Sequence, residues 1–352
     1  MTVKHEDGER EAPAGALLEI ACDESGSDGE NLTGGNTDVF AHASVRLPVV
    51  SAAGSVQEIR DRIRSPAEEY KANHLLREKH RAVLEWLLGP SGPIHGHAHV
   101  HLTEKAFFVV DRVVGLLLGD PAEALPLFRE GRRAFGEDGW REFLRAANRL
   151  LRIRYDGEPA EPVDAFFRTV DALRRAHPGT DAAARLDRLA AVRPRADAYR
   201  ARLLDARVLD GPALIPVLNP LLPAIVTTAA HWSAGGRTVR LVHDRQNMLT
   251  PERIAWIEEA ARLRGIGFGG LTLVAARQDP RVQLADFLAG IARKIASDEL
   301  NGRGDPVLTA LLRPYVGTAS VWGDERSWTL LTRNGDGAAL SANINFRGYI
   351  AR

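Results

Sequence analysis

Two short apolar runs, far apart in the sequence, each end in an aspartate, and this feature most constrains the fold. The run Ala16–Cys22 is followed by Asp23, and the run Thr238–His243 is followed by Asp244. Short apolar runs bounded by polar turn residues are typical of buried strands. Segments with helical spacing separate these runs from one another. The pattern predicts an α/β fold in which both aspartates stand at the ends of strands.

The other periodic segments extend this pattern, with one long helical stretch between them. From Asp120 to Arg207 the spacing is helical and the sequence is rich in Arg, Ala and Leu, which predicts an all-helical insertion. Between Ser320 and Arg352, short strands are expected on both sides of Asn334–Gly337, a typical hairpin turn. Further strands are expected at Val39–Val50, His95–Leu102 and Leu271–Ala276, and helices at Val56–Arg64, Glu78–Leu88, Glu104–Leu118, Pro251–Arg264 and Arg281–Leu300.

These segments divide the chain into five parts. Residues 1–14 are expected to form a flexible tail. The α/β domain is expected in two parts, 15–118 and 213–300, which the Arg-rich helical insertion 119–212 separates. Residues 301–352 are expected to form an extension that contains a helix and a β-hairpin.

Composition excludes several classes of protein. Lys plus Arg and Asp plus Glu each number 46, which excludes a strongly basic protein that coats nucleic acid or membrane but not a local basic groove. The single cysteine, Cys22, excludes an internal disulfide and a Cys-rich zinc site and fits a reducing cytoplasm. The polar N-terminus has no apolar stretch typical of a signal peptide. Four prolines interrupt the uncharged stretch Gly211–Gly236, which predicts a buried helix with Asn219 as its cap and Pro220 in its first turn, rather than a membrane span.

The Arg-rich insertion allows two interpretations. Between Arg129 and Arg207 there are 18 Arg and 13 Asp or Glu, a local excess that a nucleic-acid clamp would use. Basic and acidic residues are interleaved there, however, which favours solvated helices with i,i+4 ion pairs. Four aromatic residues of the insertion have helical spacing and are expected in its core rather than on a base-stacking surface: Trp140, Phe143, Phe166 and Phe167.

A third aspartate, Asp286, lies within the apolar helical run Val282–Gly290. A carboxylate on an apolar face is costly to bury unless it has a partner, and a divalent metal is one such partner. Acids from the ends of two strands and from a covering helix can meet at one hard cation. Two simpler interpretations remain open: a hydrogen-bonded helix acid for Asp286 and a turn-forming residue for Asp23.

Several short motifs follow one another in an order known from a bacterial family. They are Asp23-Glu24-Ser25-Gly26, Glu69-Tyr70-Lys71, Lys105, His243-Asp244 and Gln283-Leu284-Ala285-Asp286. In these motifs the chain resembles the bacterial family known as domain of unknown function 3800, over roughly Leu17–Leu118 and Val217–Leu300. The resemblance implies a ribonuclease H-like fold, with a mixed sheet flanked by helices.

The resemblance also implies a metal-dependent nuclease or other phosphodiesterase, whose substrate is left open between DNA, RNA and a small nucleotide. Asp23, Asp244 and Asp286 would bind Mg²⁺ or Mn²⁺, and Glu24 or Glu69 would complete the ligand set. Asp23 is favoured over Glu24 because successive residues of a strand point to opposite faces. Lys71 and Lys105 would donate to phosphate or support the acids, or are ordinary surface lysines. Ser25 would support the ligands without contacting the ion. The sequence leaves the oligomeric state open.

Four histidines alternate between His95 and His101 and are expected on one face of a strand. A transition-metal site is one interpretation, since neutral imidazoles suit Zn²⁺ or Ni²⁺. A polar, partly exposed strand face covered by a helix is the favoured one, because alternate side chains of a strand lie about 6.5–7 Å apart.

Two other functions compete with the phosphodiesterase. One is a non-catalytic binding or regulatory module on the same fold, in which the acids are structural. The other is a nucleotide-binding enzyme, but the sequence has no Walker-type loop, and the glycines of 265–270 precede a strand instead of following one.

Overall fold

A five-stranded mixed sheet forms the centre of the protein. The computed structural model describes residues 17–64, 71–153, 161–208 and 215–332. The strands are β1 (Leu17–Ser25), β2 (Val39–Val45), β3 (Ala98–Glu104), β4 (Thr238–Asp244) and β5 (Phe268–Val274). Their order is β3-β2-β1-β4-β5, with β1, β2 and β3 antiparallel and β1, β4 and β5 parallel. The prediction of an α/β chain with a mixed sheet is confirmed.

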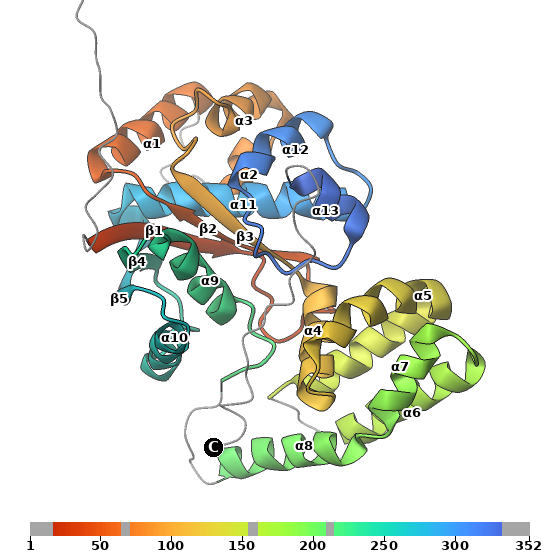
Figure 1. Ribbon diagram of the computed structural model, residues 1–352. Coiled ribbons are helices and arrows are strands. Elements are labelled where there is room, and N and C mark those ends of the chain that lie inside the picture. The colour runs from red at the N-terminus through yellow and green to blue at the C-terminus, as the bar shows by residue number, and fades with distance from the viewer. Residues whose placement is uncertain (1–16, 65–70, 154–160, 209–214, 333–352) are drawn as a thin grey trace, which may run out of the picture.

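Helices cover both faces of this sheet (Figure 1). One face packs against α11 (Pro280–Leu300), with α1 (Val49–Ile63) outside it. The other face packs against α9 (Leu221–Ser233) and α10 (Pro251–Leu263). Because both faces are buried, the central strands are mostly apolar rather than alternating, which explains the run that ends at Cys22.

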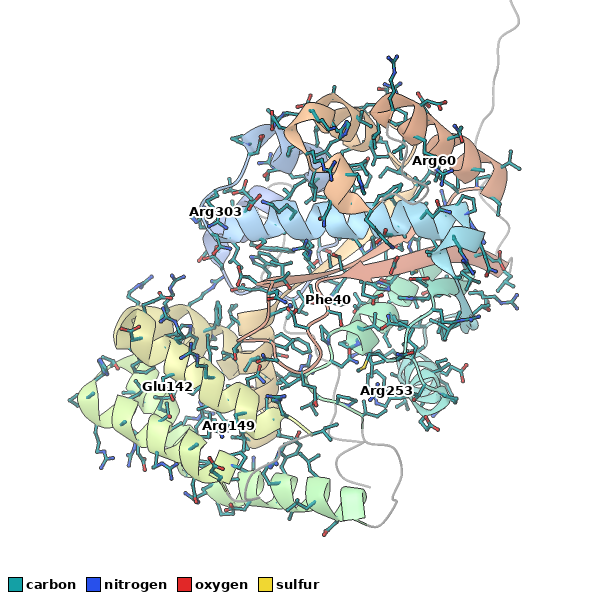
Figure 2. The ribbon with its side chains drawn as sticks, turned by 180° about the vertical axis from the view of Figure 1, so that it is seen from behind. Phe40, Arg60, Glu142, Arg149, Arg253 and Arg303 are labelled. Carbon is teal, nitrogen blue, oxygen red and sulfur yellow. The ribbon has the colours of Figure 1, made fainter. Side chains whose placement is uncertain are left out.

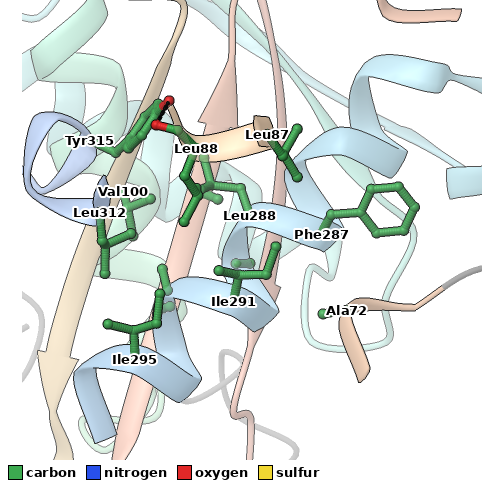
Figure 3. Packing of buried hydrophobic residues seen from close by; sticks show 14 of the residues in the cluster. Ala72, Leu87, Leu88, Val100, Phe287, Leu288, Ile291, Ile295, Leu312 and Tyr315 are labelled. Atoms are coloured by element: carbon green, nitrogen blue, oxygen red, sulfur yellow. Dashed lines mark hydrogen bonds between the residues drawn. The ribbon is translucent and has the colours of Figure 1, made fainter. Parts of the chain in front are cut away.

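The core on the α11 side joins parts of the chain that are distant in sequence (Figure 3). Leu288, Ile291 and Ile295 of α11 are packed with α3 (Arg81–Leu88) and α12 (Pro306–Leu312). The hydroxyl of Tyr315 donates to the carbonyl of Leu88 at 3.0 Å. The sheet, α11 and the C-terminal segments therefore form one core.

The close approach of α11 and α2 (Ala72–Leu75) depends on a glycine. A Cβ atom at Gly290 would lie 2.3 Å from the Cβ of Ala72. A larger residue would push the two helices apart. This glycine therefore sets the position of the residue just before α2, Lys71.

The middle of the chain is helical, as predicted. It contains α5 (Ala124–Leu151), α6 (Glu161–Ala176), α7 (Asp181–Ala190) and α8 (Arg193–Val208). They share a core with α4 (Lys105–Leu117), which directly follows β3 and which the sequence had assigned to the α/β part. The four aromatic residues expected in this core are buried there: Trp140, Phe143, Phe166 and Phe167.

The outer surface of this helical part carries charges of both signs. Glu142 and Arg149 of α5 are among the charged side chains drawn on it (Figure 2). Arg149 pairs with Glu161 of the next helix at 3.2 Å, and Arg141 pairs with Glu137, four residues earlier on α5, at 3.7 Å. These ion pairs agree with the interpretation of solvated, mutually paired helices.

Several predicted boundaries were wrong. Strand β2 ends at Val45, and helix α1 begins at Val49 instead of Val56, directly after Pro48. Helix α9 begins one residue later than expected, but the side chain of Asn219 still accepts a hydrogen bond from the amide of Leu221 at 2.9 Å. None of the helices in the described ranges is long and apolar enough to cross a membrane.

The C-terminal part also differs from the prediction. Short strands were expected after Ser320, but Glu325–Leu331 forms the helix α13. The carboxylate of Asp324 accepts from the amide of Ser327 at 2.8 Å and so caps this helix. The expected helix of the extension is present as α12. The hairpin turn Asn334–Gly337, the tail 1–14 and Glu69 lie outside the described residues.

Candidate functional site

Asp23 and Asp244 stand at the same end of two neighbouring strands. Strands β1 and β4 are parallel, and Cys22 pairs with His243, so the next residue of each strand is an aspartate. The carboxylate of Asp244 accepts from the amide of Ala276 at 2.8 Å. The carboxylate of Asp23 accepts from the amide of Glu24 at 2.7 Å. Asp244 is the last residue of its strand, as predicted, whereas β1 continues past Asp23 to Ser25; the pairing of β1 with β4 places the two acids side by side.

Helix α11 brings Asp286 and Lys71 to these acids. The helix packs on β1, and the charge of Asp286 acts on Asp23. Lys71, the residue before α2, lies with its Nζ 3.4 Å from Oδ2 of Asp286. The side chain of Asp286 is 19% exposed and that of Lys71 is 52% exposed, so this ion pair is at the edge of the site.

Like charges dominate the environment of Asp23, which is only 6% exposed. Burial raises the pKa of Asp23 to about 9. The negative charges of Glu24, Asp286 and Asp244 add to this increase of the pKa, and the amide of Glu24 opposes it. A carboxylate in this position is stabilised by a proton or by a cation.

Glu24 points to the opposite face of the sheet, as the alternation of the strand predicts. Its Oε2 lies 3.6 Å from Nε2 of His243 and accepts no hydrogen bond. Burial raises the pKa of Glu24, and His243 partly offsets this effect. Glu24 is therefore the less suitable ligand, and Asp23 is the residue directed to α11.

A chain of hydrogen bonds lies on this second face. Nδ1 of His243 is 2.9 Å from the carbonyl oxygen of Asp244, its Nε2 is 3.2 Å from Nε2 of His42, and Nδ1 of His42 is 2.9 Å from the hydroxyl of Thr228. A carbonyl oxygen only accepts, so Nδ1 of His243 donates to it. A single hydrogen bond joins the two Nε2 atoms, and Nδ1 of His42 pairs with the hydroxyl of Thr228. Burial holds the pKa of His42 well below its ordinary value.

The expected row of four histidines does not form. Strand β3 begins at Ala98, after a turn in which Gly96 has φ +77°, so His95 and His97 precede the strand. His99 and His101 lie on the strand and are buried, not partly exposed as expected. The expected cover by a helix is present, because His99 stacks on His231 of α9 with a centroid distance of 3.8 Å. Burial lowers the pKa of His101 to about 4.

Lys105 forms its hydrogen bonds with residues other than the three aspartates. It is buried at the start of α4 and donates to the carboxylate of Asp28 and to the hydroxyl of Thr37. Burial lowers the pKa of Lys105, and Asp28 opposes this effect. Lys105 therefore anchors the polar loop between β1 and β2.

Sequence reasoning missed Arg293. Its Nε donates to the hydroxyl of Ser25 at 3.0 Å, so the residue expected behind the ligands is held from α11. The available signal was the spacing of seven residues between Asp286 and Arg293, which places both on one face of a helix.

The donor chemistry of Asp23, Asp244 and Asp286 fits Mg²⁺ or Mn²⁺, since these ions prefer carboxylate oxygens. Within the described ranges, however, no three His, Cys, Asp or Glu side chains are arranged closely enough to hold a metal ion without adjustment. No family model, curated protein or solved structure matches the chain.

Proposed function

We propose that this chain is a metal-dependent phosphodiesterase of ribonuclease H-like fold that hydrolyses a phosphodiester bond in nucleic acid. The observation that carries the proposal is the environment of Asp23, which is buried among the negative charges of other acids. Such an arrangement costs stability unless a cation compensates it. A mixed sheet with β1 in its centre and acids on β1, β4 and α11 supports the same fold and site.

Asp23, Asp244 and Asp286 are the residues that would hold Mg²⁺ or Mn²⁺. The bound ion would supply an activated water and stabilise the leaving oxygen of the phosphodiester. Asp23 loses its proton when a cation is bound, because it then has a positive partner. The amide of Ala276 fixes the orientation of Asp244.

Two further residues have separate roles in this proposal. Lys71 partly neutralises Asp286 and, with its half-exposed side chain, reaches the solvent side where a phosphate would enter. Glu24 faces the other side of the sheet, beside His243, so its negative charge acts on Asp23 while its carboxylate stays outside the proposed ligand set.

The test is cleavage of labelled single-stranded DNA, double-stranded DNA and RNA with Mg²⁺ or Mn²⁺. We expect cleavage of at least one substrate by the wild type, its loss with chelator, and its loss in Asp23→Asn and Asp286→Asn. Asp298→Asn is the matched control, since Asp298 is on α11 but pairs with Lys294. Cleavage that persists in Asp23→Asn would contradict the proposal.

One observation favours a second function, a non-catalytic binding module of the same fold. Two of the acids already have protein partners, the amide of Ala276 for Asp244 and the ammonium of Lys71 for Asp286, as a structural role for the acids would require. Metal-dependent turnover that disappears in Asp23→Asn would eliminate this alternative.

A further inference from the structure

Arg293 lies on the same face of α11 as Asp286, two turns farther along. Seven residues at about 1.5 Å per residue separate them by about 10 Å along the helix axis. Asp286 acts on Asp23, and Arg293 contacts Ser25, two residues later on β1. Strand β1 and helix α11 therefore run in the same direction here. The guanidinium of Arg293 follows the acids Asp23 and Asp286 toward the end of the strand.

The backbone beside Arg293 is shaped to admit its side chain. Gly26 has φ +89°, and a Cβ atom there would lie 2.8 Å from Cδ of Arg293 and 2.4 Å from the carbonyl oxygen of Val39. Any other residue at this position would strain the backbone and displace the arginine. The glycine that follows Asp23, Glu24 and Ser25 thus has a steric purpose: it lets Arg293 reach the end of β1.

Arg293 is half-buried but forms no ion pair within 4 Å among the described residues. Asp28 and Asp298 act on it only at longer range, and each already pairs with a lysine, Lys105 and Lys294 respectively. Burial lowers the pKa of Arg293. Arg281 on the same helix differs, because it pairs with both Asp279 and Glu19.

A half-buried guanidinium without a carboxylate partner has donors left for an anion. Its single hydrogen bond to protein in the described ranges uses Nε, so the two terminal nitrogens are available for the paired hydrogen bonds that arginine forms with phosphate. Arg293 lies about 10 Å from Asp286 along the helix axis. One phosphate group is too small to contact both residues.

We propose that Arg293 binds a backbone phosphate of a nucleic-acid strand, next to the phosphate that is hydrolysed at the aspartates. The inference rests on the proposed phosphodiesterase function and specifies its substrate class. The substrate is a strand with at least two phosphates, not a mononucleotide. A purely structural role, in which Arg293 only holds Ser25, is the competing explanation.

The experiment is fluorescence anisotropy with a short fluorescein-labelled single-stranded oligodeoxynucleotide, on an Asp23→Asn background that prevents turnover, and again in the wild type with EDTA. In both settings we expect Arg293→Gln to weaken binding about 10- to 100-fold, the range for a charge-assisted hydrogen bond. The slope of log affinity against log salt should fall by about one. Arg293→Lys keeps the charge but not the paired geometry and should lose less.

Two controls separate phosphate binding from a structural role. Ser25→Ala removes the hydrogen bond that Arg293 donates and should leave the affinity within about twofold if the guanidinium serves the phosphate. Arg303→Gln removes an exposed arginine beyond the end of α11 and should have as little effect. Circular dichroism establishes that each variant is folded, and Arg293→Lys carries the test if Arg293→Gln does not fold.

Three results would overturn the inference: no binding of the oligonucleotide by the parent protein, unchanged affinity and salt slope in Arg293→Gln, or an equal loss in Ser25→Ala. Failure of the proposed function gives a different result. In that case wild type does not bind or use Mn²⁺, whereas the loss in Arg293→Gln is still measured in EDTA.

Discussion

The two faces of the sheet at the end of β1 use polar residues in opposite ways. On the α11 face, Asp23 and Asp286 are both acidic, and the negative charge of Asp286 acts on Asp23. On the α9 face, Thr228, His42 and His243 form a continuous hydrogen-bonded chain that ends on a carbonyl oxygen. One face lacks a positive partner at its centre, whereas the other links Thr228, His42 and His243 in one chain beside Glu24, whose Oε2 accepts no hydrogen bond.

The two faces differ because their polar side chains have different hydrogen-bonding capacities. Neutral imidazoles and hydroxyls both donate and accept, so they satisfy one another when buried. Carboxylates only accept when ionised, so neighbouring ones are stable only with a proton or a cation. The histidines are more numerous, yet the clustered aspartates are the residues for which we propose a cation.

The largest expected effect on stability comes from breaking the histidine chain. His42→Leu removes the partner of the Thr228 hydroxyl and of Nε2 of His243, which should lower the free energy of unfolding by about 2–5 kcal/mol. Thr228→Val, which removes one end of the chain, should cost about 1 kcal/mol. Urea denaturation measures both. A folded His42→Leu protein that no longer binds Mn²⁺ would show that the two faces do not act separately.

The acid side of the stability curve should depend on His101. The pKa of His101 is about 4 in the folded protein and about 6.5 when unfolded, so the unfolded chain gains the proton first as the pH falls. Stability from this group is therefore present above pH 6.5 and is lost between about 6.5 and 4, by up to about 3 kcal/mol. His101→Gln should flatten this limb in denaturation curves recorded across that range. An unchanged slope would contradict the burial of a neutral ring.

Asp23 should give the opposite pH dependence. Its pKa is about 9 in the folded protein and about 3.8 when unfolded, so its contribution is lost as the pH rises between these values. Asp23→Asn should therefore stabilise the metal-free protein near neutral pH, by about 2 kcal/mol. Thermal melting in EDTA tests this, with Asp298→Asn as control. A less stable Asp23→Asn protein would mean that the carboxylate already has a favourable partner.

The smallest effect is expected at the edge of the site. Lys71 and Asp286 form a pair that is partly exposed, so Lys71→Gln should change the unfolding free energy by less than about 1 kcal/mol. Its effect on cleavage should be much larger than its effect on stability, if the ammonium also serves the phosphate. If Lys71→Gln has small effects on both the unfolding free energy and cleavage, Lys71 serves only as the ion-pair partner of Asp286.

The sequence was most informative where local pattern and final structure agree. Apolar runs that end in aspartate predicted the positions of Asp23 and Asp244, and an acid within an apolar helix singled out Asp286. Strand alternation correctly separated Asp23 from Glu24.

Prediction failed where contacts between distant segments or a single backbone angle decide the outcome. Alternation alone predicted a strand from His95, but the positive φ of Gly96 delays the strand to Ala98. The pairing of His42 with His243 and Thr228 joins three separate segments, and no local pattern reveals it. Helix α13 was taken for strand because the cap at Asp324 was overlooked.

The most direct test of the account is calorimetric titration of Mn²⁺ into the wild type, Asp23→Asn and Asp298→Asn, repeated in buffers of different protonation enthalpy. We expect the wild type and Asp298→Asn to bind Mn²⁺ with release of a proton, and Asp23→Asn not to bind. Equal binding by wild type and Asp23→Asn, or no binding by either, would contradict the claim that the aspartates of the α11 face are held for a cation.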